Sequence, residues 1–283
     1  MQGWYVNMLE QFIFENHLGL RFIGLENGVY MNYNDLRDYS WNYDTINNKI
    51  SRFYRSIKNR KLPLVVYCTS DEKAIEIKNR LMELSEADIQ AKLPGKVYIG
   101  EYYTNGFITS STKSDYLITK RLCKLNLTLT SNNPAWYREQ THAFIPGKDG
   151  SLGYGEGTDY PYDYKYDYSL SLQGKRIMCD AVGNSAFKLL IYGEATNPSV
   201  IIGGHTYTVY GTVGKSETLL IDGLKKTITL TTAAGNKVNW YAKRERKNYI
   251  FEPLKPGQNT VTWNGTFGFD LTVVEERSEP KWT

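Results

Sequence analysis

Residues 218–231, TLLIDGLKKTITLT, decide the fold class of this chain. Two runs of β-branched and apolar residues, 218–222 and 226–231, flank a short break with a glycine, which predicts two neighbouring strands. Similar runs recur through the second half of the chain, separated by Gly, Asn and Pro: 187–192, 199–202, 206–210, 249–251, 259–263 and 268–274. Many short strands without a helical period predict a β-sandwich.

The first half of the chain combines strand-like runs with one helix. Residues 62–67, LPLVVY, form a dense apolar run typical of a buried strand. Ser70 or Asp71 can then cap a helix. Its apolar stripe recurs at helical spacing along Ala74, Ile77, Leu81 and Leu84. The stripe predicts that this helix packs on a sheet.

An Asn-Gly pair predicts a hairpin after the helix. Asn105 and Gly106 lie between the runs 96–103 and 106–109, and both residues tolerate the positive φ of a tight turn. Residues 117–130 then alternate apolar and polar side chains, as a half-buried strand does. An exposed edge at Asn105-Gly106 can contact another subunit or pair within its own chain, and the sequence leaves both open.

A glycine-rich stretch divides the chain. We expect an N-terminal domain over 1–147, a linker over 148–158 and a C-terminal domain over 159–283. Five tyrosines at a strict period of two open the second domain, and an extended chain places all their rings on one face. They are Tyr160, Tyr162, Tyr164, Tyr166 and Tyr168. We expect this face to lie against its own domain or to contact a subunit or partner.

Composition and charge limit the classes of function. Of 283 residues, 41% are hydrophobic and 23% charged, which allows packed cores. A net charge of +4 falls short of a dedicated nucleic-acid binder. The basic runs 52–61 and 243–247 are either phosphate-facing patches, or solvated faces or subunit contacts. No apolar stretch is long enough to span a bilayer, and we expect no membrane contact.

The sequence shows no catalytic constellation. His17, His142 and His205 lie in separate expected elements without metal-ligand spacing. No nucleophile elbow, P-loop or dinucleotide fingerprint is present. The three cysteines are widely spaced, and we expect buried, reduced thiols. We therefore expect no enzyme activity, no catalytic residue, no cofactor and no metal.

Saccharide binding is a second class of function that some C-terminal residues fit. Trp240 and Trp263 can stack on a sugar ring, and Arg244 can contact its hydroxyls. Alternatively, both Trp residues belong to the core of a sandwich, where large aromatics dominate packing. Near the end of the chain, Trp282 is either part of a frayed tail or an anchor docked on a neighbouring surface.

The order and spacing of several segments resemble the phage distal tail (Dit) protein family. Four segments in the second half are the more specific: YPYDY at 160–164, YG…NPS at 192–199, YIFEP…PGQN at 249–259 and ERSEPKW at 276–282. In the first half, DLR at 35–37, the expected helix, the hairpin and NPAW at 133–136 follow the family's first-domain pattern.

This resemblance implies a mainly β protein of two domains. The first is an N-terminal β-sandwich with one helix and a hairpin extension. The second is a C-terminal galectin-like or carbohydrate-module-like β-sandwich. The implied function is structural: a homo-hexameric ring of a phage tail tip or baseplate that joins the tail tube to the distal hub and receptor-binding machinery. A saccharide-binding tail adhesin that uses the C-terminal sandwich is the alternative.

The resemblance also implies partners and a location. The partners are the tail tube protein, a tail-associated hub or lysin protein, the tape measure protein and receptor-binding proteins. DNA is expected to cross the lumen of the ring without specific binding. The protein is expected in the virion, at the tail tip, after synthesis in the cytoplasm of the host bacterium.

Overall fold

The computed structural model describes residues 11–115, 119–146 and 173–282, which form two compact units. The first unit contains described residues up to Arg138 and residues 277–282, and the second contains the described part of 139–276. The boundary falls within β10 (Trp136–Phe144), and the chain returns through β21 (Gly268–Arg277). The expected boundary at 147 is later than this one, and the expected linker, 148–158, lies outside the described residues.

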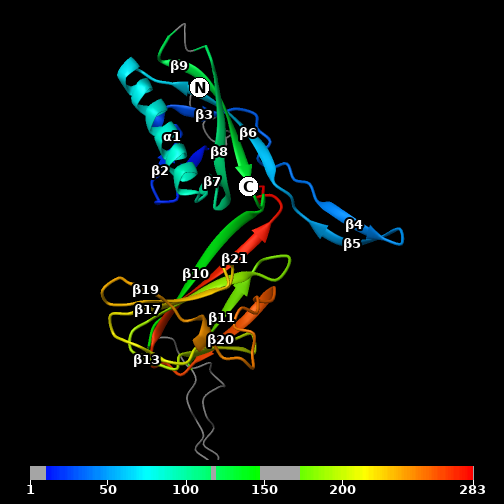
Figure 1. The fold of residues 1–283 in the computed structure, drawn as a ribbon, viewed down its shortest axis with the longest axis vertical. Coiled ribbons are helices and arrows are strands. Elements are labelled where there is room, and N and C mark those ends of the chain that lie inside the picture. The colour runs from blue at the N-terminus through cyan, green and yellow to red at the C-terminus, as the bar shows by residue number, and fades with distance from the viewer. Residues whose placement is uncertain (1–10, 116–118, 147–172, 283) are drawn as a thin grey trace, which may run out of the picture. The chain divides into compact units, whose positions relative to one another are not determined.

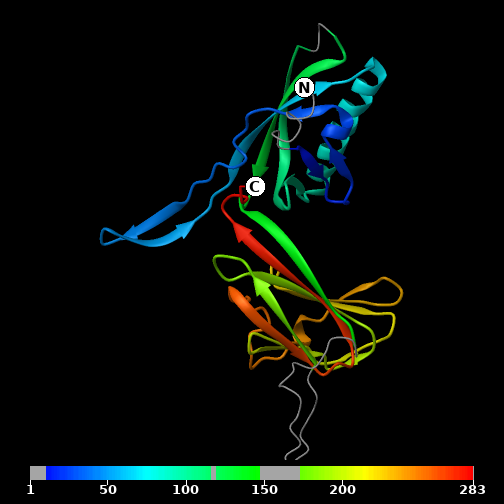
Figure 2. The same cartoon turned by 180° about the vertical axis from the view of Figure 1, so that it is seen from behind.

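The fold is mainly β, as predicted, with one α-helix among the described residues (Figures 1 and 2). In the first unit, β8 (Tyr102–Ser114) pairs with a different neighbour along each half. Through Gly106 it pairs with β7 (Gly95–Ile99), which leads to β1 (Ile13–Glu15) and β2 (Arg21–Ile23). From Phe107 on it pairs with β9 (Leu122–Ser131), which leads to β6 (Lys58–Tyr67) and β3 (Val29–Met31). One strand thus joins both sheet segments around a common core.

The helix α1 (Asp71–Ala91) has the predicted apolar stripe. Ala74, Ile77, Leu81 and Leu84 are buried and belong to the core of the first unit. The Ser70 side chain accepts a hydrogen bond from the Lys73 amide at 3.2 Å, so it satisfies one of the unpaired amides of the first turn. The prediction of this helix from spacing and capping is confirmed.

The strand predicted from the dense apolar run 62–67 lies in β6, and the strand predicted from the alternating run 117–130 is found as β9, Leu122–Ser131. Leu62, Leu64 and Val66 of β6 are buried, and the buried residues of β9 point the same way from the neighbouring strand. The other face carries polar side chains, and hydroxyl groups there bond across strands, for example Ser110 to Thr128 at 2.8 Å. The sheet therefore has one dry and one wet face.

The hairpin turn is not at Asn105-Gly106, so this prediction is wrong. The chain turns at Gly100 and Glu101, and Asn105 and Gly106 pair inside β8 with Lys96 and Gly95. Gly100 has φ of 57°, which meets the need of a tight turn for a positive φ at its first central residue. Gly106 is required for a different reason: a Cβ there would lie 2.8 Å from the Leu129 and Ser131 side chains.

The second unit contains two larger strand groups and a short pair. One group runs β11 (Gln173–Cys179), β20 (Gly257–Trp263), β14 (Ser199–Ile202) and β15 (His205–Thr208). The other runs β19 (Lys237–Asn239), β18 (Thr227–Thr231), β17 (Thr218–Asp222), β12 (Ala186–Tyr192), β21 and β10. The short pair is β13 (Ala195–Thr196) with β16 (Thr212–Val213). Short 3-10 turns are η1 (Leu25–Asn27), in the first unit, and η2 (Tyr241–Lys243). The predicted strand at 249–251 is instead a turn.

Aromatic side chains fill the core of the second unit. Phe144 stacks on Phe269 with ring centroids 4.5 Å apart, and Trp263 meets both rings edge-on. The Trp263 indole donates a hydrogen bond to the Phe267 carbonyl at 3.1 Å, so its polar atom is satisfied inside the core. These rings and the aliphatic side chains around them form one core between the two strand groups.

The cysteines are buried and free, as predicted. Burial raises the pKa of the thiols of Cys68, Cys123 and Cys179. A raised thiol pKa leaves little thiolate at neutral pH, so these side chains behave as small apolar residues. Among the described helices, none combines the length and the apolar character that a membrane span needs.

The close approach at Gly106 gives a stability prediction. Gly106→Ala would place its Cβ 2.9 Å from the Thr130 carbonyl, a backbone atom that cannot turn aside. We expect a loss of about 1–3 kcal/mol in the free energy of unfolding, the usual cost of overpacking. Chemical denaturation measures it. Gly183→Ala is the control, because nothing lies within 4 Å of its added Cβ; equal midpoints for the two variants would contradict the packing argument.

Candidate functional site

An exposed hairpin, which we call the arm (residues 42–54), is the most distinctive surface of the first unit. It consists of β4 (Asn42–Ile46) and β5 (Lys49–Tyr54), which pair with each other and with no other strand in the described part of the chain. Asn47 and Asn48 both have positive φ, of 50° and 60°, as the two-residue turn of a hairpin requires. Figure 1 shows β4 and β5 reaching away from the other strands of the first unit.

Every residue of both arm strands is exposed. Large apolar side chains are among them: Tyr43 is 59% exposed, Ile46 66%, Ile50 53% and Phe53 58%. A two-stranded hairpin is marginally stable by itself in water, and contiguous exposed apolar side chains mark contact surfaces. The arm is therefore a candidate for burial against another protein surface.

Stacked cations and hydrogen bonds hold the root of the arm. The Arg55 guanidinium lies 4.2 Å from the centre of the Trp41 ring. The Trp41 indole donates to the Ser278 hydroxyl at 3.1 Å, and its ring meets Phe53 edge-on at 6.5 Å. Arg55 also donates to the Ser278 hydroxyl at 3.4 Å, so one residue before the arm and one after it both bond to a serine from the far end of the chain.

Residues 277–282, which we call the tail segment, lie against the first unit. Arg37 donates to the Pro280 carbonyl at 3.0 Å, and its guanidinium lies 4.1 Å from the centre of the Trp282 ring. The Trp282 indole donates to Glu279 at 2.8 Å. Trp282 therefore contacts its own chain, and the ring still remains 75% exposed. Its expected docking on another subunit stays a prediction.

A buried arginine braces the sheet next to the arm. Arg60, on β6, is fully buried and donates to the Pro134 carbonyl at 2.8 Å and to Thr104 at 3.4 Å. Burial lowers its pKa to about 10, and within the described residues no carboxylate lies within ion-pair distance. Its hydrogen bonds tie β6 to β8 and to the turn before β10, so the strand that follows the arm is firmly placed.

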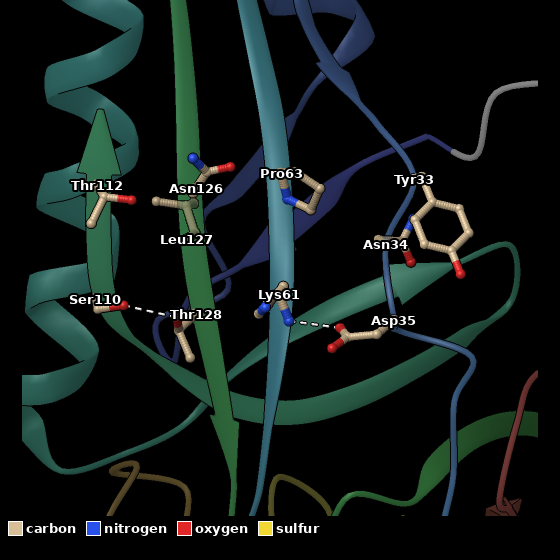
Figure 3. A pocket seen from close by; sticks show the side chains of 10 residues that line it. All are labelled: Tyr33, Asn34, Asp35, Lys61, Pro63, Ser110, Thr112, Asn126, Leu127 and Thr128. Atoms are coloured by element: carbon tan, nitrogen blue, oxygen red, sulfur yellow. Dashed lines mark hydrogen bonds between the residues drawn. The ribbon is translucent and has the colours of Figure 1, made fainter. Parts of the chain in front are cut away.

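A groove of about 570 Å³ lies on the wet face of the same sheet (Figure 3). The Asp35 carboxylate accepts a hydrogen bond from the Lys61 amide at 2.6 Å, which caps a part of the β6 edge that β3 does not cover. Most of the lining is polar: Tyr33, Asn34, Asp35, Lys61, Pro63, Ser110, Thr112, Asn126, Leu127 and Thr128. This open groove with its mixed polar and apolar lining differs from the enclosed, mainly apolar pocket that a small molecule usually fills.

The proposed saccharide contacts lie in different environments. Trp263 is 1% and Trp240 6% exposed, so neither ring can stack on a sugar in this structure, and the core interpretation holds for both. Arg244 lies 3.9 Å from the centre of the Tyr241 ring and donates to the Tyr241 carbonyl at 2.8 Å. The Tyr160, Tyr162, Tyr164, Tyr166 and Tyr168 series lies outside the described residues.

The histidines do not form a common site. His17 Nδ1 lies 2.6 Å from the buried Asp88 carboxylate, which links the turn between β1 and β2 to the last turns of α1. His205 bonds the Tyr249 carbonyl at 2.9 Å. Burial is the main cause that lowers the pKa of His142, with Lys175 adding to it. Among the described residues, no three His, Cys, Asp or Glu side chains cluster as metal ligands would.

Solved structures of other proteins share the fold described above. No family model and no curated protein matches the sequence. The chain is similar to the SPP1 Dit protein, described as a paradigm of the hub adsorption apparatus in phages that infect Gram-positive bacteria. The identity is 11% and the TM-score 0.55, over 94% of this chain and 99% of that one.

Two chains of the phage P2 baseplate in its activated conformation are also similar. The TM-score is 0.59 for each, with 12% identity for the calcium form and 13% for the strontium form. Both comparisons cover 96% of this chain and 100% of the other. The chain therefore has the fold of phage Dit hub and baseplate proteins, as its sequence motifs predicted.

Sequence reasoning placed a hairpin extension in the first domain only through the resemblance, and it missed the residues of the arm. A local signal was present: Asn47-Asn48 separates two short runs with aromatic and β-branched residues. It was overlooked because these runs have no alternating pattern, and neither face of the hairpin is buried.

The tail segment gives a second prediction. Arg37→Ala removes both the hydrogen bond to Pro280 and the cation–π contact with Trp282. We expect faster amide hydrogen exchange in residues 278–282, by about fivefold, for a loss of roughly 1 kcal/mol of local stability. Exchange measured by mass spectrometry tests this, with Arg80→Ala on α1 as the control. Unchanged exchange in the Arg37 variant would show that these contacts do not hold the segment.

Proposed function

We propose that this protein is a structural component of a phage tail tip or baseplate, and that six copies form a ring between the tail tube and the distal hub. The fold shared with the SPP1 Dit protein and the P2 baseplate chains supports a place in such an assembly. The single observation that carries the ring is the arm, which exposes apolar residues on both strands.

A ring needs a heterologous contact, in which one surface of each copy meets a different surface of the next. The arm suits this role, because each copy can lay its arm on the following copy and so close the ring. Contact would remove Tyr43, Ile46, Ile50 and Phe53 from water, a gain that the free chain lacks. Both outer edges of the arm also retain backbone groups that can extend a neighbour's sheet.

The proposal assigns roles to the two domains. The first forms the ring, and the second is a peripheral galectin-like sandwich. We propose four kinds of neighbour for the whole protein in the tail: the tail tube protein, a hub or lysin protein, the tape measure protein and receptor-binding proteins. Trp282 and the Tyr160–Tyr168 series are further proposed contacts.

The remaining parts of the proposal concern chemistry and place. The protein performs no catalysis, and DNA crosses the ring without specific binding. It is made in the host bacterial cytoplasm and resides at the tail tip of the virion. A saccharide-binding adhesin is the alternative, but the burial of Trp240 and Trp263 removes the two rings on which it rested.

Native mass spectrometry of the full chain tests the ring. We expect six subunits, or stacked sixes, for the unchanged protein. The double variant Ile50→Asp with Phe53→Asp places two charges where the arm should be buried against the next subunit. Burying these charges costs several kcal/mol at each contact between subunits, so the variant should be monomeric. Circular dichroism should remain unchanged, because neither residue belongs to a core.

Ile75→Asp is the matched control, since Ile75 is 40% exposed on α1, away from the arm strands. It should leave the six-subunit species intact. A ring that survives the double arm variant would refute the role of the arm. An unchanged protein that stays monomeric at all accessible concentrations would refute a ring formed by this protein alone.

A further inference from the structure

Positive charge in the second unit is concentrated in one segment. Residues 225–255 contain eight Lys and Arg and two Glu, a net charge of +6. The whole chain carries +4, so all other residues together carry −2. The segment therefore creates a local positive field on a chain that is otherwise slightly acidic.

The cations at the centre of this segment have no carboxylate partner. Within the described residues, no Asp or Glu oxygen lies within 4.0 Å of Lys226, Lys243, Arg244, Arg246 or Lys247. Elsewhere in the second unit, Lys188 pairs with Glu139 at 2.9 Å and Lys215 with Glu194 at 3.8 Å. Cations whose charge is not neutralised by a carboxylate of the chain are available to an external anion.

Three of these cations are held over aromatic rings. Lys243 Nζ lies 3.6 Å from the Trp240 ring centre, and the Arg244 guanidinium lies 3.9 Å from that of Tyr241. Lys226 Nζ lies 5.6 Å from the Tyr249 ring centre and donates to the Phe251 carbonyl at 3.3 Å. Cation–π contact restrains these flexible side chains, so less entropy is lost when they bind an anion.

The same contacts occupy the rings. Tyr241 stacks on Phe251 with centroids 6.0 Å apart and also meets Arg244, while Tyr249 meets Phe251 edge-on and also faces Lys226. Tyr241 is nevertheless 41% and Tyr249 54% exposed, so contact with a ring can accompany charge recognition at this surface. The cations without carboxylate partners are the feature that favours an anionic ligand.

We propose that Lys226, Lys243, Arg244, Arg246 and Lys247, the basic patch, bind a polymer of phosphodiester-linked polyols or sugars of the kind displayed on cell surfaces. Phosphates spaced along such a chain can meet several fixed cations at once, with affinity gained from release of counterions. The choice of a cell-surface polymer rests on the proposed place at the tail tip; the binding of a polyanion does not.

Fluorescence anisotropy with an end-labelled oligomer of glycerol phosphate tests this on the full chain. We expect saturable binding that weakens steeply as salt rises. Arg246→Glu with Lys247→Glu reverses two exposed charges and should weaken binding at least about tenfold at low salt. Lys73→Glu with Lys215→Glu changes the net charge equally at exposed sites outside the patch and should weaken it less than about threefold.

Three results would overturn the proposal. One is no binding by the unchanged protein, or binding unaffected by the Arg246 and Lys247 changes. Another is an equal loss in both double variants, which would show a response to net charge alone. The third is equal or tighter binding of single-stranded or duplex DNA with the same number of phosphates, which would make nucleic acid the ligand.

Native mass spectrometry of the same variants separates this inference from the proposed ring. The Arg246 and Lys247 variant should keep the six-subunit species, and its loss would show instead that the patch is a subunit contact. If the unchanged protein binds the oligomer but forms no ring, the proposed assembly fails while the basic patch stands.

Discussion

The change of partner along β8 is the constraint on which the first unit depends. The strand pairs with β7 through Gly106 and with β9 from Phe107, so two sheet segments share one continuous backbone. The absence of a side chain at Gly106 lets Leu129 and Ser131 approach at this junction. Arg60 then bonds across from β6 to Thr104. The arm ends at Tyr54 and β6 begins at Lys58, so this junction lies on the strand that directly follows the arm.

Stability and exposure are divided between different parts of the molecule. The two cores are rich in large, fully buried aromatic and aliphatic side chains, with the Trp263 cluster in one and the α1 stripe in the other. The arm and the basic patch, by contrast, keep apolar rings or unpaired cations in water. A fold that is stable without these surfaces can retain them for contacts with other molecules, and this separation underlies both proposals.

Local patterns predicted the elements that a local pattern controls. The α1 stripe, its Ser70 cap and the buried strand at 62–67 follow from spacing and capping alone. The turn predicted at Asn105-Gly106 was wrong because a glycine is required both in tight turns and where two strands approach closely. Only the pairing of strands distinguishes the two cases, and the sequence does not show it. The burial of Trp240 and Trp263 depends on the same long-range pairing. The arm could not be predicted from periodicity, because neither face of it packs on a core. The sequence shows the basic run, but it does not show which of its cations lack a carboxylate partner.

The tail segment has a consequence for the order in which the molecule can be built on the ribosome. Trp41 donates its hydrogen bond to Ser278, a residue that is translated 237 positions later. Arg37 donates to Pro280, which is translated 243 positions later. The whole second unit is translated between them. The arm strands can therefore pair early in synthesis, but their root closes only after the other unit has emerged. A nascent chain that stalls inside the second unit would therefore carry an arm whose root still lacks its contacts with Ser278 and Pro280.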